Sequence, residues 1–173
     1  METDFRGLIR TLSQAGVEFI VVGGAAAIGH GSARLTSDLD IVYRRTPENI
    51  SRLVSALAPL NPYLRGAPPN LPFRWSDETI KKGLNFTLVT SRGALDLLGE
   101  ITGGGSYDHI VAHSLTLKLH DSECLCLGIE YLIKVKRAAG RPKDFEAIAE
   151  LEAILEERQQ ANNQNLKANS SSQ

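Results

Sequence analysis

Two aspartates at alternate positions of an apolar segment constrain this chain most strongly. Residues 38–43 read Asp-Leu-Asp-Ile-Val-Tyr, and the alternation of polar and apolar residues at its start predicts a strand. Because side chains two apart in a strand leave the same face, Asp38 and Asp40 share one face, while Leu39 and Ile41 enter the core. Neighbouring carboxylates repel each other, so this pattern indicates a site that a divalent cation neutralises.

The segment before these aspartates points to a phosphate ligand. A β-branched run at residues 17–22 predicts a buried strand, Gly23-Gly24 break it, and a short helix is expected from Ala25. Glycine lets backbone approach a ligand closely, and the free N–H groups at the start of a helix attract phosphate. The residues predicted to bind the phosphates of a nucleotide are Gly23, Gly24, Arg34 and Thr36.

A third acid lies within a later apolar strand. Asp96 is the single charged residue of the stretch 93–98, where a buried lone carboxylate is costly unless it is paired or bound to a metal. Phosphoryl-transfer sites often hold two metal ions about 3.5–4 Å apart. We therefore expect Asp96 to join Asp38 and Asp40 as a metal ligand and to deprotonate an attacking hydroxyl. Taken alone, Asp96 has another explanation, a salt bridge to an arginine.

The remaining pattern predicts one domain in which helices alternate with short strands. Helices are expected near residues 3–15, 47–57, 107–112, 129–139 and 142–155, and further strands near residues 84–89, 94–98, 114–120 and 123–127. Five prolines between Pro59 and Pro72 indicate a long loop. The expected fold is α/β (α+β), a mixed β-sheet with helices mainly on one face. We expect a domain at residues 1–158 and a polar, disordered tail at 159–173.

Composition narrows the classes of partner. The formal net charge is −1, so no global basic field attracts long nucleic acid. No run approaches about 20 apolar residues and no apolar signal segment follows the N-terminus, so we expect a cytoplasmic protein without a membrane partner. Cys124 and Cys126 lack a second pair that would complete a zinc site, and are expected to behave as small apolar side chains.

Several local patterns have more than one interpretation. Gly24 to Gly29 has the spacing of a P-loop, but His30 and Gly31 stand where lysine and serine or threonine are required. The basic residues between 134 and 143 form either a solvated face or a contact with phosphate or RNA. Trp75 either stacks on a base or caps the core.

One ordered set of motifs makes the sequence resemble a known family. The set consists of Gly23-Gly24, then Arg34-x-Thr36-x-Asp38-x-Asp40, then Asp96 on a later strand. In this order it resembles the polymerase-beta-like nucleotidyltransferase superfamily. The closer resemblance, over residues 17–155, is to a small stand-alone bacterial group that includes abortive-infection and toxin–antitoxin nucleotidyltransferases. Many active members of the superfamily carry a serine where this chain has Gly24.

The resemblance implies a reaction and roles for particular residues. Residues 141–144, Arg-Pro-Lys-Asp, preceded by Lys136, resemble the group's C-terminal motif, which implies that Lys136 contacts the nucleotide. By the same resemblance, Asp38 and Asp40 bind Mg²⁺ or Mn²⁺ and Asp96 completes the catalytic triad. The implied reaction moves a nucleoside monophosphate from an NTP to a hydroxyl of a protein, a tRNA or a small molecule.

Two other functions are compatible with the sequence. The first is a non-catalytic module with a nucleotidyltransferase fold, which acts as an antitoxin or binds a second protein. The second is a D-x-D glycosyltransferase that uses a sugar nucleotide. Glycosyltransferases of that type are usually larger, and their D-x-D motif needs no third acid such as Asp96.

Overall fold

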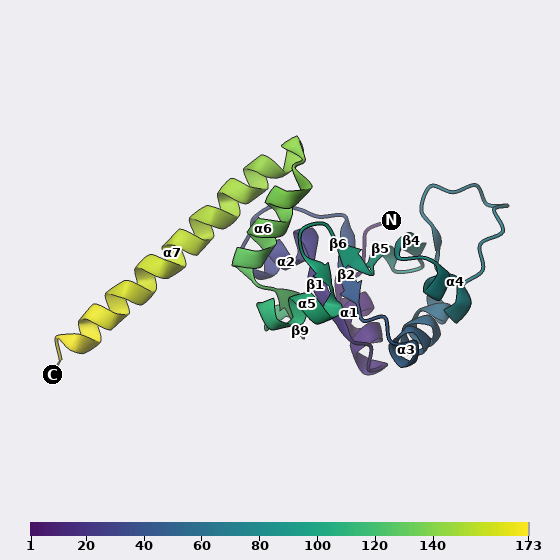
Figure 1. Ribbon diagram of the computed structural model, residues 1–173, viewed down its shortest axis with the longest axis horizontal. Coiled ribbons are helices and arrows are strands. Elements are labelled where there is room, and N and C mark those ends of the chain that lie inside the picture. Colours follow the sequence, from purple (N-terminus) through teal and green to yellow (C-terminus); the bar gives the residue numbers. More distant parts are fainter. Residues whose placement is uncertain (173) are drawn as a thin grey trace.

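A seven-stranded mixed sheet forms the centre of the protein in the computed structural model, which describes residues 1–172 (Figure 1). Its strands, in spatial order, are β3 (Tyr63–Leu64), β4 (Asn85–Thr90), β5 (Gly93–Leu98), β2 (Asp38–Tyr43), β1 (Phe19–Val22), β9 (Ser122–Leu127) and β8 (Ser114–Leu119). The pairs β1–β9 and β2–β5 are parallel, and the other pairs are antiparallel. A separate two-stranded ribbon joins β6 (Glu100–Ile101) to β7 (Gly105–Ser106). The predicted mixed sheet is confirmed.

Helices connect most of these strands. Their bounds are α1 (Phe5–Gln14), α2 (Gly23–Gly29), α3 (Pro47–Leu57), α4 (Asp77–Lys82), α5 (Tyr107–Ile110), α6 (Ile129–Ala139) and α7 (Phe145–Ser170), with 3-10 turns η1 (Ala58–Leu60), η2 (Val111–His113) and η3 (Pro142–Asp144). Local sequence sets several of these bounds. The Asp4 side chain caps α1 by accepting from the Gly7 N–H, Thr46 caps α3 in the same way, and Gly140 ends α6 in the left-handed conformation.

One face of the sheet is sealed by apolar side chains. Leu39 and Ile41 of β2 and Leu95 and Leu97 of β5 have no exposed surface, and they share one core with the buried residues of α1, α3 and α4. On the opposite face, Asp38 and Asp40 of β2 and Asp96 of β5 are only half-buried. The pleat therefore directs the acidic residues away from the main core.

The proline-rich segment contains more structure than a loop. The turn η1 and the short strand β3 form within it, and β3 pairs with β4 through the register Leu64 to Leu88. The helix α4, which the sequence pattern did not predict, follows at its end. Trp75 donates from Nε1 to the carbonyl of Val54 at 2.9 Å and packs partly buried on the core. Trp75 thus caps the core, one of its two interpretations.

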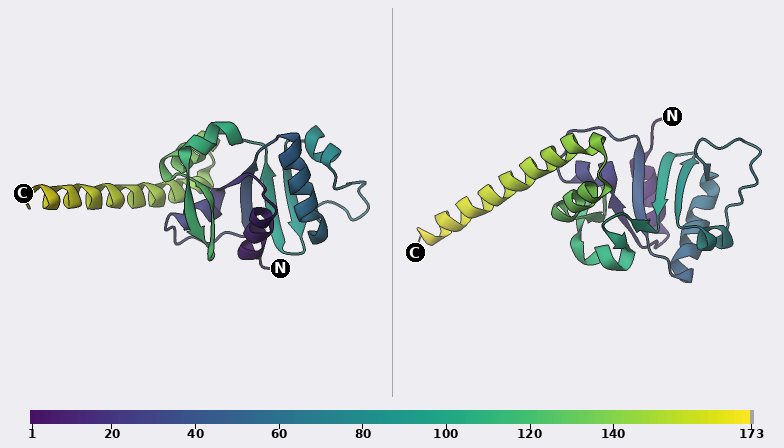
Figure 2. Two further views of the ribbon diagram at one scale, coloured as in Figure 1. Left: turned by 90° about the horizontal axis from the view of Figure 1, so that it is seen from below. Right: turned by 45° about the horizontal axis from the view of Figure 1, so that its top comes forward.

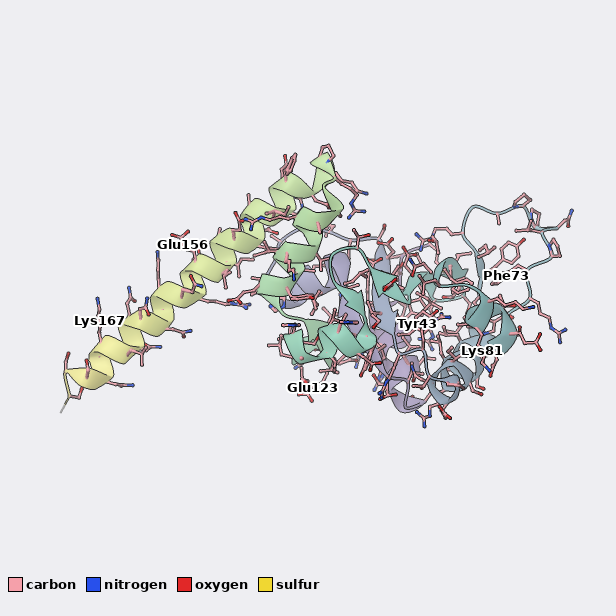
Figure 3. All side chains as sticks on the ribbon, viewed as in Figure 1. Tyr43, Phe73, Lys81, Glu123, Glu156 and Lys167 are labelled. Atoms are coloured by element: carbon pink, nitrogen blue, oxygen red, sulfur yellow. The ribbon has the colours of Figure 1, made fainter. Side chains whose placement is uncertain are left out.

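The C-terminal helix differs most from expectation. Residues from 159 onward, expected to be disordered, continue α7 to Ser170, and every one of them up to residue 172 is exposed. The helix extends away from the body of the protein in all views (Figures 1 and 2), with Glu156 and Lys167 pointing into solvent (Figure 3). Gln173 lies outside the described residues, and the domain boundary at residue 158 stays a prediction. No helix among the described residues is long and apolar enough to cross a membrane.

Candidate metal and nucleotide site

Three carboxylates converge on the open face of the sheet. Asp40 of β2 lies directly beside Asp96 of β5 in the parallel register, and Asp38 lies two residues earlier on the same face of β2. One ligand oxygen from each of the three lies within 4.8 Å of the other two. Among residues 1–172, this is the one group of at least three acidic, histidine or cysteine side chains that is spaced to hold a metal ion.

The local electrostatics favour a cation at this point. Burial, followed by the charges of Asp38 and Asp96, raises the pKa of Asp40 from 3.8 to about 7. Burial also raises the pKa of Asp96, an effect that the neighbouring Arg65 opposes. Mg²⁺ and Mn²⁺ prefer carboxylate oxygens as ligands, and a cation bound here would relieve the repulsion between the neighbouring carboxylates. The three residues therefore fit such an ion.

Arg65 contributes a positive charge that the sequence analysis did not identify. Its guanidinium forms an ion pair with Asp38 at 3.4 Å and a second, shorter one with Asp96. The salt bridge between Asp96 and an arginine, which was considered as an alternative for this residue, is therefore present. No motif marks Arg65 in the sequence, because only the pairing of β3 with β4 brings it near the acids.

The double glycine fits closely beneath the acids. Gly23 has a φ of +63°, and a Cβ at this position would lie 2.3 Å from Oδ2 of Asp40. A Cβ on Gly24 would lie 2.7 Å from Oγ1 of Thr36. A serine at position 24 would thus require Thr36 to move. The helix α2 begins at Gly23, two residues earlier than expected.

All of the predicted site residues line one cleft of about 640 Å³. They are Gly23, Gly24, Arg34, Thr36, Asp38, Asp40, Asp96 and Lys136. The cleft extends from the acids to α6, where Leu132 and Val135 form an apolar wall. The arrangement places three acids at one end of a cleft large enough for a nucleotide.

The basic residues that line the cleft, Arg34, Lys136, Arg141 and Lys143, lie in different environments. Lys136 on α6 is largely buried, and burial lowers its pKa, an effect that Asp144, at 3.9 Å, opposes. Arg141 also donates two hydrogen bonds to the carboxylate of Asp144, at 2.6 and 3.3 Å. These bonds join the two ends of the 141–144 segment and fix its conformation beside the cleft. Arg34 is half-exposed and pairs with Glu146 at 3.4 Å. Of the five basic residues between 134 and 143, Lys136, Arg141 and Lys143 line the cleft, whereas Lys134 and Arg137 do not.

His30 has a structural role. It is buried, its Nε2 lies 2.8 Å from the carbonyl of Leu127, and Arg158 donates to its backbone carbonyl at 2.8 Å. These contacts attach the end of α2 to β9 and α7. Cys124 and Cys126 are likewise buried, as their small apolar character predicts.

Comparison with known proteins supports the fold. No family model matches the sequence, and no curated protein matches it. Among solved structures, the chain is similar to a crystal structure of a "putative nucleotidyltransferase" from Thermotoga maritima. The TM-score is 0.50 at 13% sequence identity, and the match covers 86% of this chain and 94% of that chain. At this identity the likeness shows a nucleotidyltransferase-like fold and no more.

Proposed function

We propose that this protein is a metal-dependent nucleotidyltransferase that moves a nucleoside monophosphate from an NTP to an acceptor hydroxyl. The observation that carries the proposal is the convergence of Asp38, Asp40 and Asp96 at one end of a cleft that also contains Lys136. A nucleotidyltransferase-like fold alone would not suffice, because one fold hosts many functions. The acids add the chemistry that phosphoryl transfer requires.

Each residue has a role that follows from its position. Asp38 and Asp40 would hold Mg²⁺ or Mn²⁺, which supplies positive charge against the triphosphate when it is bound. Gly23 and Gly24 allow the phosphates to approach the first turn of α2, and Lys136 lines the same cleft with a positive charge that is largely, but not fully, buried. These contacts would orient the α-phosphate toward the acids.

Asp96 would act as the base. Its carboxylate takes the proton of the acceptor hydroxyl, whose oxygen forms a bond to the α-phosphorus of the NTP. The bond from that phosphorus to the oxygen of the β-phosphate breaks, and pyrophosphate leaves. Burial raises the pKa of Asp96, which makes its carboxylate a better proton acceptor than an exposed aspartate.

The biological setting is part of the same proposal. The motif resemblance supports the small bacterial group of abortive-infection and toxin–antitoxin nucleotidyltransferases, with a protein, a tRNA or a small molecule as the acceptor. We place the reaction in the cytoplasm, where NTPs and Mg²⁺ are available. The apolar wall of the cleft formed by Leu132 and Val135 would contact the less polar part of the nucleotide or acceptor.

Transfer of label from the α-phosphate of an NTP tests the proposal directly. The protein is incubated with each α-labelled NTP, Mg²⁺ and a bacterial cell extract, and the labelled fractions are separated into protein, RNA and small molecules. We expect label in one fraction, and its loss with Asp96→Asn. The control Glu123→Gln removes an exposed carboxylate of β9 outside the cleft and should keep full transfer. Failure of the unaltered protein to transfer label from any NTP would refute the proposal.

A non-catalytic binding module is the second candidate, and Arg65 favours it. An arginine that pairs with both Asp38 and Asp96 balances their charge without any metal. Calorimetric titration with Mg-ATP, Mg-GTP, Mg-CTP and Mg-UTP separates the two candidates. Binding of one of these nucleotides supports the enzyme, whereas binding of none supports the module.

A further inference from the structure

Arg65 is held in line with the acidic residues across four strands. Its backbone N–H donates to the carbonyl of Thr87 at 2.9 Å, which extends the β3–β4 pairing by one residue. Thr87 lies opposite Asp96, and Asp96 lies beside Asp40. Arg65 therefore starts from the edge of the sheet on the same face as the three acids.

The guanidinium of Arg65 is fixed by contacts with β4 and with the acids. Its Nε and Nη2 donate to the carbonyl of Leu88 at 3.3 and 3.1 Å, which holds the guanidinium over β4. The same guanidinium then reaches Asp38 through Nη1 and Asp96 through Nη2. Arg65 is about one-third exposed, and both carboxylates are less exposed than that. The guanidinium is thus directed at two of the three predicted metal ligands.

We propose that Arg65 is a built-in counter-ion of the acidic site, which holds Asp38 and Asp96 when no metal is bound and leaves them when a divalent cation binds. The inference rests on the proposed function, because it assigns a competitor to the same metal site. Arg65 and a divalent cation bind the same carboxylates with charge of the same sign, so each opposes the other. The pairing lowers the affinity of the free protein for metal and holds the two carboxylates in place until a divalent cation binds.

Removal of the guanidinium should therefore strengthen metal binding. Arg65→Met keeps a long side chain over β4 and removes the positive charge, and Arg65→Gln serves as a second variant if the first folds poorly. The matched control is Arg74→Met, because Arg74 is an exposed arginine that precedes α4 and forms no ion pair among the described residues. Far-UV circular dichroism verifies that each variant is folded.

The measurement is Mn²⁺ binding to the full-length protein without nucleotide, followed by the loss of the electron paramagnetic resonance signal of free Mn²⁺. It is made at about pH 8, above the pKa of about 7 of Asp40, so that protons do not compete with the ion. Loss of two partly exposed ion pairs should lower the Mn²⁺ dissociation constant about tenfold in Arg65→Met and Arg65→Gln. Arg74→Met should bind as the unaltered protein does.

The outcomes separate this inference from the proposed function. Tighter binding in both Arg65 variants, with Arg74→Met unchanged, supports a competing counter-ion. Equal or weaker Mn²⁺ binding in the Arg65 variants overturns the inference alone and leaves the metal site in place. Absence of Mn²⁺ binding in every variant, with or without an NTP, overturns the metal site and the inference together.

Discussion

Asp40→Asn should stabilise the metal-free protein, and the effect should depend on pH. The buried carboxyl of Asp40 has a pKa of about 7, whereas an ordinary aspartate has a pKa of 3.8. Between these values the folded chain keeps a proton that the unfolded chain has lost. The free energy of unfolding therefore falls as pH rises through this window, by about 1.4 kcal/mol per pH unit. Asparagine at position 40 cannot ionise, so it removes this loss.

The magnitude follows from the same two pKa values. The difference between 3.8 and about 7 corresponds to a loss of about 4 kcal/mol in the free energy of unfolding once Asp40 is fully ionised. We expect about 2–4 kcal/mol, because the three neighbouring acids titrate together. The advantage of Asp40→Asn should be close to zero near pH 4, grow up to pH 7 and level off above it. The direction is unusual, because most aspartate pKa values are lowered on folding and then stabilise proteins at neutral pH.

Urea denaturation in the presence of EDTA, at several pH values between about 4 and 8, measures this difference. Glu123→Gln controls for the loss of one negative charge, and Mg²⁺ in place of EDTA should stabilise only chains with the intact triad. A pH-independent difference between the two proteins would refute the reasoning. So would an Asp40→Asn variant that is less stable than the unaltered protein at pH 8.

Three further changes test other parts of the structure. Gly23→Ala should cost at least about 1–2 kcal/mol in urea denaturation, because it forces a positive φ and places a methyl group against Asp40; unchanged stability would contradict this. Lys136→Met should weaken Mg-nucleotide binding about tenfold by calorimetry, whereas the exposed Lys134→Met should not; equal effects would remove Lys136 from the site. A chain that ends at Arg158 should melt within about 2 °C of the full chain, because the rest of α7 is exposed; a larger loss would show that residues 159–173 belong to the domain.

Local patterns were sufficient where one strong rule applied. The alternation of residues 38–43 predicted β2 to the residue, and the helix expected at residues 129–139 matches α6. The expectation that Asp96 shares a site with the aspartates of β2 needed only the strand pattern and the cost of burying a carboxylate. The structure brings these acids together, and their catalytic and metal-binding roles stay predictions.

Other features depend on contacts that a single sequence does not reveal. The strand β3 has two residues and exists through its pairing with β4, so neither it nor Arg65 had a local signal. Phe145 fits the helical period of the core residues of α7, yet it is 63% exposed, whereas Ile148 and Leu151 are buried and Leu155 packs partly buried on the core. The extension of α7 past residue 158 has no apolar period, which made disorder the natural expectation.

The alternating pleat of β5 ties the chemistry of the cleft to the integrity of the core. Leu95 and Leu97 have no exposed surface, and Asp96 lies between them on the opposite face. A shift of β5 by a single residue would turn the carboxylate of Asp96 into the apolar core and expose both leucines. Such a shift would unfold the sheet, and not only abolish the activity of the site. Substitution of an aspartate can therefore abolish activity in a folded protein, whereas a register shift that moves an aspartate out of the site would also disrupt the fold. Folded variants that lack activity should accordingly carry changed side chains in the cleft and an unchanged strand alignment.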